Sequence, residues 1–407
     1  MAGWTSGNEL ELLENGEEYF PRLCAEVEAA AEEIVLETYI WYEDEISTRL
    51  AHALIDAARR GVGVTITVDG YGSPAFSDGL LTPLRDAGIA VRSFDAQRPL
   101  LRIRTNMFCR LHRKIVVIDR KVAFVGGINV WALHLRRFGS ESMQDYAVRV
   151  TGPVVSDIYE ATQHLPAARP GALRRRWRNR GGRARRARRE LGRPPEDAQV
   201  AFVARDNDGH RRDIEMMYRA GIRAAKEQIL IANAYFFPGY RFLRDLTQAA
   251  RRGLDVRLVL QGKPDVAISA VAASMLYTHL FSAGVRIYHY KDRALHAKVA
   301  VIDGTWATVG SSNLDPVSLG LNLEANLFVR DEAFASALRR SLLEIIETAC
   351  EDVTTEVPRK SLMRRLLLMI VYHATRHMPD WGRLLRRRGQ AARAMQGPDE
   401  RSGHALE

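Results

Sequence analysis

The chain has 407 residues, of which 46% are hydrophobic, enough for one large domain or two ordinary domains with real cores. Its three cysteines are widely separated and show no CxxC spacing, which argues against a disulfide framework and a zinc site and favours a reducing compartment. The N-terminus lacks the pattern of a secretory signal, and the longest apolar run covers only residues 366–372. Because a membrane span needs about 18 apolar residues, the sequence predicts a soluble or peripheral protein.

The formal net charge of +10 is concentrated in one segment. Residues Arg169–Arg193, here called the arginine segment, contain twelve arginines and a single acid, Glu190, for a local charge of +11. Subtracting +11 from +10 leaves −1 for the rest of the chain. The basicity is therefore a local feature, which is typical of a contact with an anionic membrane or with nucleic acid.

The first half of the chain reads as strands that alternate with helices. A buried strand is predicted from Ile34 (IVLETYIWYEDE), followed by a helix that ends at Gly61 in ARRG and by the strand VGVTITVDG. The stretch LRDAGIAVRSFD from Leu84 and the strand LHRKIVVID from Leu111 follow.

The second half repeats these five landmarks in the same order. It contains ILIANAYFFP from Ile229, AARRG ending at Gly253, LDVRLVLQG, LFSAGVRIYHY from Leu280 and LHAKVAVID from Leu295. Such repetition indicates a duplicated unit. We therefore predict an α/β fold of two similar halves, each a mixed β-sheet flanked by helices, related by a pseudo-twofold axis with one shared active site.

Four segments are expected from this pattern. They are a first half over residues 1–165, an arginine-rich linker over 166–198, a second half over 199–357 and a basic amphipathic tail over 358–407. In the tail, a helical spacing beside several arginines predicts a helix at a membrane interface; the spaced positions are Leu362, Leu366, Met369, Ile370 and His373. A terminal helix docked on the body is the alternative, and the last twelve residues are predicted to be disordered.

Each half carries a His-x-Lys pair that is followed by four residues and an Asp. These motifs are His112, Lys114 and Asp119 in the first half, and His296, Lys298 and Asp303 in the second. After six further residues each half has a turn of small residues and an asparagine, namely Gly126-Gly127-Ile128-Asn129 and Gly310-Ser311-Ser312-Asn313.

The spacing of these motifs points to the chemistry of a phosphate ester. Residues i and i+2 of a strand share a face, so each His and its Lys project into one pocket. The two lysines, the two asparagines and Ser311 are the candidate donors to the phosphate oxygens. One histidine can attack phosphorus and the other can exchange the proton of the leaving and entering hydroxyls. By pattern alone the two histidines are interchangeable.

Carboxylates are also available to orient these imidazoles. Asp145 lies in DYAVRV and Glu324 lies at the matching place in EANLFV. Asp119 and Asp303 belong to the catalytic motifs but stand at the strand ends, where we expect them to brace the following turn. No metal or other cofactor is predicted, because the lysine beside each histidine would repel a cation and offers it no acceptor.

The doubled motif resembles the signature of the phospholipase D superfamily. Longer stretches, among them LETYIWYEDE, LHRKIVVIDRKVAFVGGIN and LHAKVAVIDGTWATVGSSNLDPVSLGLNLEANL, are similar to bacterial cardiolipin synthases, particularly the short B-type enzymes without transmembrane helices. The resemblance covers roughly residues 8–350. It departs from many relatives at Gly127, where a serine is usual, and at Val317, where similar synthases often carry arginine.

This resemblance implies more than the residue pattern does. It implies two phospholipase D-like halves, phosphatidylglycerol as substrate, a phosphatidyl-histidine intermediate on His112 and an acid/base role for His296. The resemblance is weak through the arginine segment and the tail. Cardiolipin synthesis needs access to lipid, so we expect a peripheral protein on the cytoplasmic side of a bacterial membrane, with the arginine segment and the tail as its contacts with anionic lipid. The alternatives are a hydrolase that gives phosphatidic acid, a nuclease that uses the arginine segment on DNA, and a non-catalytic membrane-binding protein; nucleic acid is the less favoured partner.

Overall fold

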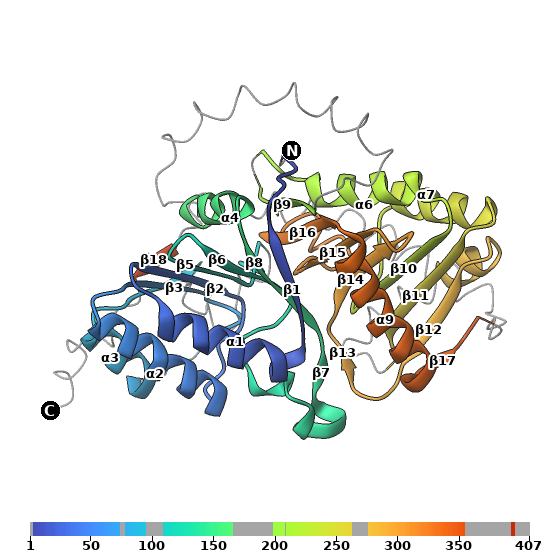
Figure 1. Ribbon diagram of the computed structural model, residues 1–407. Coiled ribbons are helices and arrows are strands. Elements are labelled where there is room, and N and C mark those ends of the chain that lie inside the picture. Colours follow the sequence, from blue (N-terminus) through green and yellow to red (C-terminus); the bar gives the residue numbers. More distant parts are fainter. Residues whose placement is uncertain are drawn as a thin grey trace, which may run out of the picture.

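The fold is taken from a computed structural model that describes residues 3–73, 78–94, 109–165, 198–207, 209–262, 276–354 and 392–394. Two eight-stranded mixed sheets form its framework (Figure 1). The predicted α/β fold with two similar halves is confirmed. Among the helices that the structure describes, none combines the length and the apolar character needed to cross a membrane.

The first sheet is built almost entirely from the first half. Its strands, in spatial order, are β1 (Glu9–Glu14), β8 (Tyr146–Thr151), β6 (Val122–Gly126), β5 (Ile115–Ile118), β2 (Glu33–Thr38), β3 (Gly63–Asp69), β4 (Ala90–Phe94) and β18 (Ala392–Ala394). Strands β2, β3 and β4 run parallel to one another, and the other pairings are antiparallel.

The second sheet has the same order of equivalent strands. They are β9 (Gln199–Arg205), β16 (Glu324–Arg330), β15 (Trp306–Gly310), β14 (Lys298–Ile302), β10 (Gln228–Asn233), β11 (Asp255–Gln261), β12 (Arg286–Tyr290) and β17 (Cys350–Asp352). Each position in one sheet thus has a counterpart in the other, and both motif-bearing strands, β5 and β14, are central.

Helices cover the sheets. They are α1 (Asn15–Ala29), α2 (Glu45–Arg59), α3 (Asp78–Asp86), α4 (Val154–Gln163), α6 (Asp213–Ala224), α7 (Tyr240–Arg251) and α9 (Glu332–Ala349). Helix α2 begins at a capping box, in which Asp44 accepts the Ser47 N–H and the Ser47 hydroxyl accepts the Asp44 N–H. Helices α1 to α3 lie on one face of the first sheet and α4 on the other (Figure 1).

The two halves share one hydrophobic core. Strand β5 sends Ile115 and Val117 into this shared core, with Val299 and Val301 of β14 and the apolar faces of α4 and α9. Its alternate residues, Val116 and Ile118, instead face the core beneath α1 and α2. The motif strands are therefore buried on both faces, as their apolar composition predicts.

Of the four expected segments, the structure describes much of the two halves and only a short part of the tail. Residues 166–197 and most of the tail lie outside the described residues, including the predicted interfacial helix and the final twelve residues. Within the tail, β18 adds an antiparallel strand to β4 at the edge of the first sheet. The four segment boundaries stay a prediction.

Candidate active site

The catalytic motifs meet where the two halves face each other. Each histidine stands just before its central strand, and each candidate carboxylate stands next to or at the start of β8 or β16. Next to each histidine, a backbone hydrogen bond joins the two halves. The His112 N–H donates to Leu323 O at 2.9 Å, and the His296 N–H donates to Gln144 O at 2.9 Å. The second contact extends the short parallel pair of β7 (Met143–Gln144) with β13 (Ala294–Leu295).

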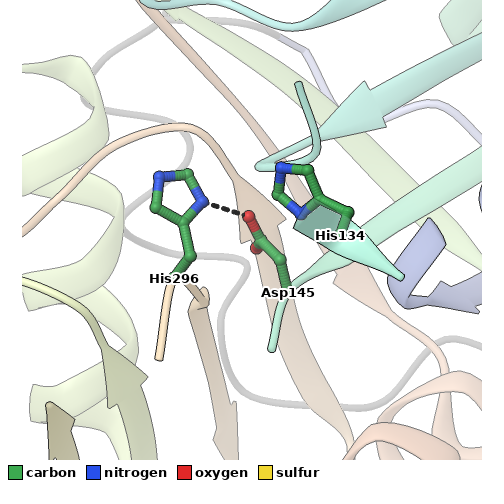
Figure 2. A group of neighbouring side chains, drawn as sticks. All are labelled: His134, Asp145 and His296. Carbon is green, nitrogen blue, oxygen red and sulfur yellow. Dashed lines mark hydrogen bonds and ion pairs between the residues drawn. The ribbon is translucent and has the colours of Figure 1, made fainter. Parts of the chain in front are cut away.

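These crossings bring each histidine to the carboxylate of the opposite half. His112 Nδ1 lies 2.9 Å from Glu324 Oε2, and His296 Nδ1 lies 2.5 Å from Asp145 Oδ2 (Figure 2). Because a carboxylate only accepts, each Nδ1 carries a proton and each Nε2 is left for chemistry. One half alone would contain neither pair, so the site needs both halves.

Both motif lysines are buried at the same centre. Lys114 Nζ donates to His112 O at 2.9 Å and lies 5.3 Å from the ring centroid of Tyr39. Lys298 Nζ donates to His296 O and lies 3.9 Å from Asp145 Oδ2. Two ammonium groups therefore stand next to the two imidazoles, in the arrangement that a phosphodiester anion requires.

Burial sets the protonation of this cluster. It lowers the pKa of His112, and it lowers the pKa of His296 further with help from the Lys298 ammonium. Burial and the charge of Lys298 lower the pKa of Lys114 to about 7. The histidines are thus neutral at neutral pH, which leaves an Nε2 lone pair for nucleophilic attack.

The two predicted asparagines take different positions. Asn129 is buried, and its Oδ1 accepts the Ile40 N–H at 3.1 Å, which leaves only Nδ2 to serve a phosphate. Asn313 is also buried, and its Oδ1 has no hydrogen-bond partner among the described residues. Phosphate binding by both side chains stays a prediction.

The sequence predicts that the hydroxyl of Ser311 binds phosphate, but the structure gives it other partners and corrects this prediction. The hydroxyl is fully buried, donates to Glu324 Oε2 at 2.5 Å and accepts the Ala325 N–H at 3.0 Å. Ser311 therefore holds the carboxylate that holds His112. Its counterpart is Gly127, and a Cβ there would lie 2.3 Å from Asp145 Oδ1. The missing serine of the first half thus makes room for the Asp145 carboxylate.

Asp119 and Asp303 do not reach the reacting groups. Asp119 accepts the backbone N–H groups of residues 31–33, and Asp303 accepts those of residues 226–228, at 2.7–2.9 Å. The four residues of β5 separate Asp119 from the histidine end by about 13 Å. These aspartates brace the turn that leads into β2 or β10, rather than the turn that follows them, and their place in the catalytic set is corrected.

Three residues near the site were not expected from the sequence. The Tyr39 ring lies 5.0 Å from the His112 ring, and the second half has Ala234 at the equivalent place after β10. Buried Arg205 donates to the carbonyls of Gly320 and Asn322, just before Glu324. His134 lies with its ring centroid 5.7 Å from that of His296. Tyr39 lies in a repeated stretch, but its aromatic ring does not recur in the other half, and Arg205 and His134 lie outside the repeated landmarks, so the duplication gives no signal for the three side chains.

Among the described residues, one group has the side chains to hold a metal ion: His134, Asp145 and His296, whose candidate ligand atoms all lie within 4.8 Å of one another. The group does not fit a cation. His134 Nε2 accepts the Asn129 N–H at 3.1 Å, so its Nδ1 carries a proton and cannot coordinate. The Lys298 ammonium lies 3.9 Å from the Asp145 carboxylate.

The sequence matches the family model described as "Cardiolipin synthase, PLD-like domain" in two places, over residues 23–161 and 218–346. It is 47% identical over 379 residues to cardiolipin synthase B of Salmonella typhi, covering 93% of this chain and 90% of that protein. It is 46% identical over 378 residues to cardiolipin synthase B of Escherichia coli K12, covering 92% and 90%.

A solved structure shares the fold at low sequence identity. The crystal structure of phosphatidylserine synthase from Haemophilus influenzae Rd KW20 aligns with a TM-score of 0.67 and 12% identity, over 95% of this chain and 97% of that one.

Proposed function

The chain belongs to the family of cardiolipin synthases with phospholipase D-like domains, and from this premise we propose that it joins two phosphatidylglycerol molecules into cardiolipin and releases glycerol. The observation that carries the proposal is the pair of His–carboxylate contacts made across the two halves, beside two buried lysines. That arrangement suits one phosphodiester and two successive transfers at phosphorus.

In the first transfer, His112 Nε2 attacks phosphorus of the first phosphatidylglycerol. Its Nδ1–H remains hydrogen-bonded to Glu324, and this carboxylate stabilises the positive charge that develops on the ring. His296 takes up a proton on Nε2 when the phosphodiester anion binds beside it, and Asp145 stabilises the resulting imidazolium. As the bond from phosphorus to the glycerol oxygen breaks, that oxygen takes this proton from Nε2 of His296. Lys114 and Lys298 offset the charge that grows on the non-bridging oxygens.

In the second transfer, the glycerol hydroxyl of another phosphatidylglycerol enters at the place that the first glycerol left. Nε2 of His296 takes the hydroxyl proton, the oxygen attacks phosphorus, and the bond from phosphorus to His112 breaks. The site returns to its starting protonation state, so one pair of histidines completes the cycle.

The proposal is tested by incubating the purified protein with phosphatidylglycerol vesicles and analysing the lipids and the released alcohol. We expect cardiolipin and free glycerol in equal amounts. Phosphatidic acid in place of cardiolipin would show that water captures the intermediate, and the protein would then be a hydrolase. A protein that turns over no lipid but nicks plasmid DNA would contradict the proposal altogether.

We further propose that the protein reaches its substrate as a peripheral protein on the cytoplasmic face of the bacterial membrane. The support is the local charge of +11 in the arginine segment, because each basic residue near an anionic surface contributes about 1 kcal/mol. The amphipathic pattern of the tail gives a second possible contact.

Vesicle sedimentation tests this anchor. The double substitution Arg174→Gln/Arg175→Gln should weaken binding to phosphatidylglycerol vesicles roughly 30-fold at low salt, and ~1 M salt should remove most of the difference. Arg49→Gln/Arg251→Gln, at two exposed helical positions outside the segment, removes the same charge and serves as the control. Equal losses in the two variants would mean that net charge, and not this segment, determines binding.

A further inference from the structure

His134 is a buried histidine that the proposed chemistry does not use. It ends the short 3₁₀ helix η1 (Ala132–His134), between the asparagine of the first motif and Asp145, and its exposed fraction is 0%. A single histidine in an apolar stretch is usually a packed core residue. Two observations distinguish this one.

The first contact fixes the tautomer of His134. Its Nε2 accepts the backbone N–H of Asn129 at 3.1 Å, so that nitrogen carries the lone pair. Burial lowers the pKa of His134 to about 3, so the ring is neutral and its one proton is on Nδ1. This Nδ1–H is buried and has no hydrogen-bond partner within the described parts of the chain. A buried donor without an acceptor is destabilising.

The second observation is the proximity of Asp145, which has a carboxylate oxygen within 4.8 Å of a ring nitrogen of His134. Figure 2 shows a ring nitrogen of His134 directed toward the Asp145 carboxylate, on the side away from His296. Asp145 Oδ2 accepts from His296, and Oδ1 accepts the Tyr146 N–H at 2.8 Å. A carboxylate can accept about four hydrogen bonds, so it has room for a further donor.

The two halves differ in the hydroxyl group that reaches the orienting carboxylate. Glu324, which orients His112, receives the Ser311 hydroxyl at 2.5 Å. Asp145, which orients His296, can receive no such hydroxyl because the equivalent residue is Gly127. The Nδ1–H of His134 is the available neutral donor on that side. The second half thus holds its carboxylate through the serine of the turn, whereas in the first half η1 brings a ring nitrogen of His134 within 4.8 Å of the carboxylate.

We propose that His134 is a positioning residue, which donates its Nδ1–H to Asp145 and so holds His296 in place for proton exchange with the glycerol hydroxyls. The inference rests on the proposed cardiolipin synthesis for its kinetic consequences and on geometry for the contact itself. Asp145 is also approached by Lys298, by His296 and, at longer range, by Lys114, so His134 adds a donor without adding charge.

Two substitutions separate positioning from packing. His134→Phe fills the space but removes the hydrogen bond from Asn129 and the proposed one to Asp145. His134→Gln can accept from Asn129 with its oxygen and donate to Asp145 with its nitrogen. We expect the Phe variant to lose roughly 10- to 100-fold in kcat, as for a hydrogen bond to a charged group, with KM for phosphatidylglycerol unchanged. The Gln variant should recover most of the rate.

The pH profile gives a readout that packing alone would not move. Without the donor, the ionised form of Asp145 is less stable, so the acidic limb of kcat should move to higher pH in the Phe variant and return in the Gln variant. Equal rates and profiles in wild type and the Phe variant would overturn the proposal. Equal losses in both variants with a lower melting temperature would overturn it too, because they would indicate packing.

A histidine ¹⁵N spectrum tests the contact without turnover. His134 should appear as the neutral Nδ1–H tautomer at all pH values where the protein is folded, and His134→Phe should shift the Nδ1–H resonance of His296. An Nε2–H tautomer, or an unshifted His296, would overturn the proposal even if no lipid were converted. Absence of cardiolipin from the wild type, with the expected spectrum, would count against the proposed function alone.

Discussion

Replacing His112 with alanine is expected to abolish cardiolipin formation, with a loss of at least roughly 10⁴-fold, because His296 is needed for proton exchange with the glycerol hydroxyls and cannot carry the phosphatidyl group at the same time. The fold should survive, since His112 is a site residue at the meeting of the halves and not a member of the strand β5 core. His52→Ala, at an exposed position of α2, is the matched control and should leave the rate unchanged.

The substitution His296→Ala should block a different step of the reaction, the protonation of the leaving glycerol. Without an acid for glycerol, His296→Ala should be inactive on phosphatidylglycerol, but it should still react with a phosphatidyl ester whose leaving group departs as a stable phenolate. The enzyme should then stop as the covalent adduct, because no base remains to activate the acceptor hydroxyl. Intact-protein mass spectrometry and peptide mapping should find one phosphatidyl group on His112. An adduct on His296 in the His112→Ala protein, and none in the reverse case, would exchange the two roles.

The sequence predicted the fold and the centre of the site for one physical reason. The duplicated pattern of apolar strands and amphipathic helices encodes the same packing twice, so two similar sheets with the motif strands at their centres follow from it. Strand alternation then places each His and Lys together. These inferences need only local periodicity, and they extend to the burial of residues 115–118 on both faces.

The pairing between the halves could not be read from the sequence. Asp145 and Glu324 were expected to orient the histidines, but nothing in one linear repeat states which carboxylate serves which ring. The pairing depends on two tertiary contacts, the backbone hydrogen bonds from His112 to Leu323 and from His296 to Gln144. The motif predicts Ser311 as a donor to the phosphate, yet its hydroxyl points at Glu324. Asp119 was grouped with catalysis because it recurs in the motif, although the recurrence reflects a repeated turn contact.

Gly127→Ser is also expected to have a large effect, because the first half has no space for the serine that the second half carries. A Cβ at this position would lie 2.3 and 2.4 Å from the two Asp145 carboxylate oxygens, well inside contact distance. The carboxylate must move, and it then no longer holds Nδ1 of His296. We expect a loss of roughly 10²-fold or more in cardiolipin formation, since misorienting a catalytic imidazole costs up to ~10⁴-fold.

A matched pair of variants shows whether this effect comes from the carboxylate. The double variant Gly127→Ser/Asp145→Glu gives the first half the pair that Ser311 and Glu324 form in the second, where strand register places them at equivalent positions. It should recover much of the rate that Gly127→Ser loses. Ser311→Gly removes the hydrogen bonds of the hydroxyl to Glu324 and from the Ala325 N–H but creates no clash, so a loss of only about tenfold is expected. If the double variant were no better than the single one, the serine would act on the backbone of the turn, and Asp145 would not be the residue that Gly127 accommodates.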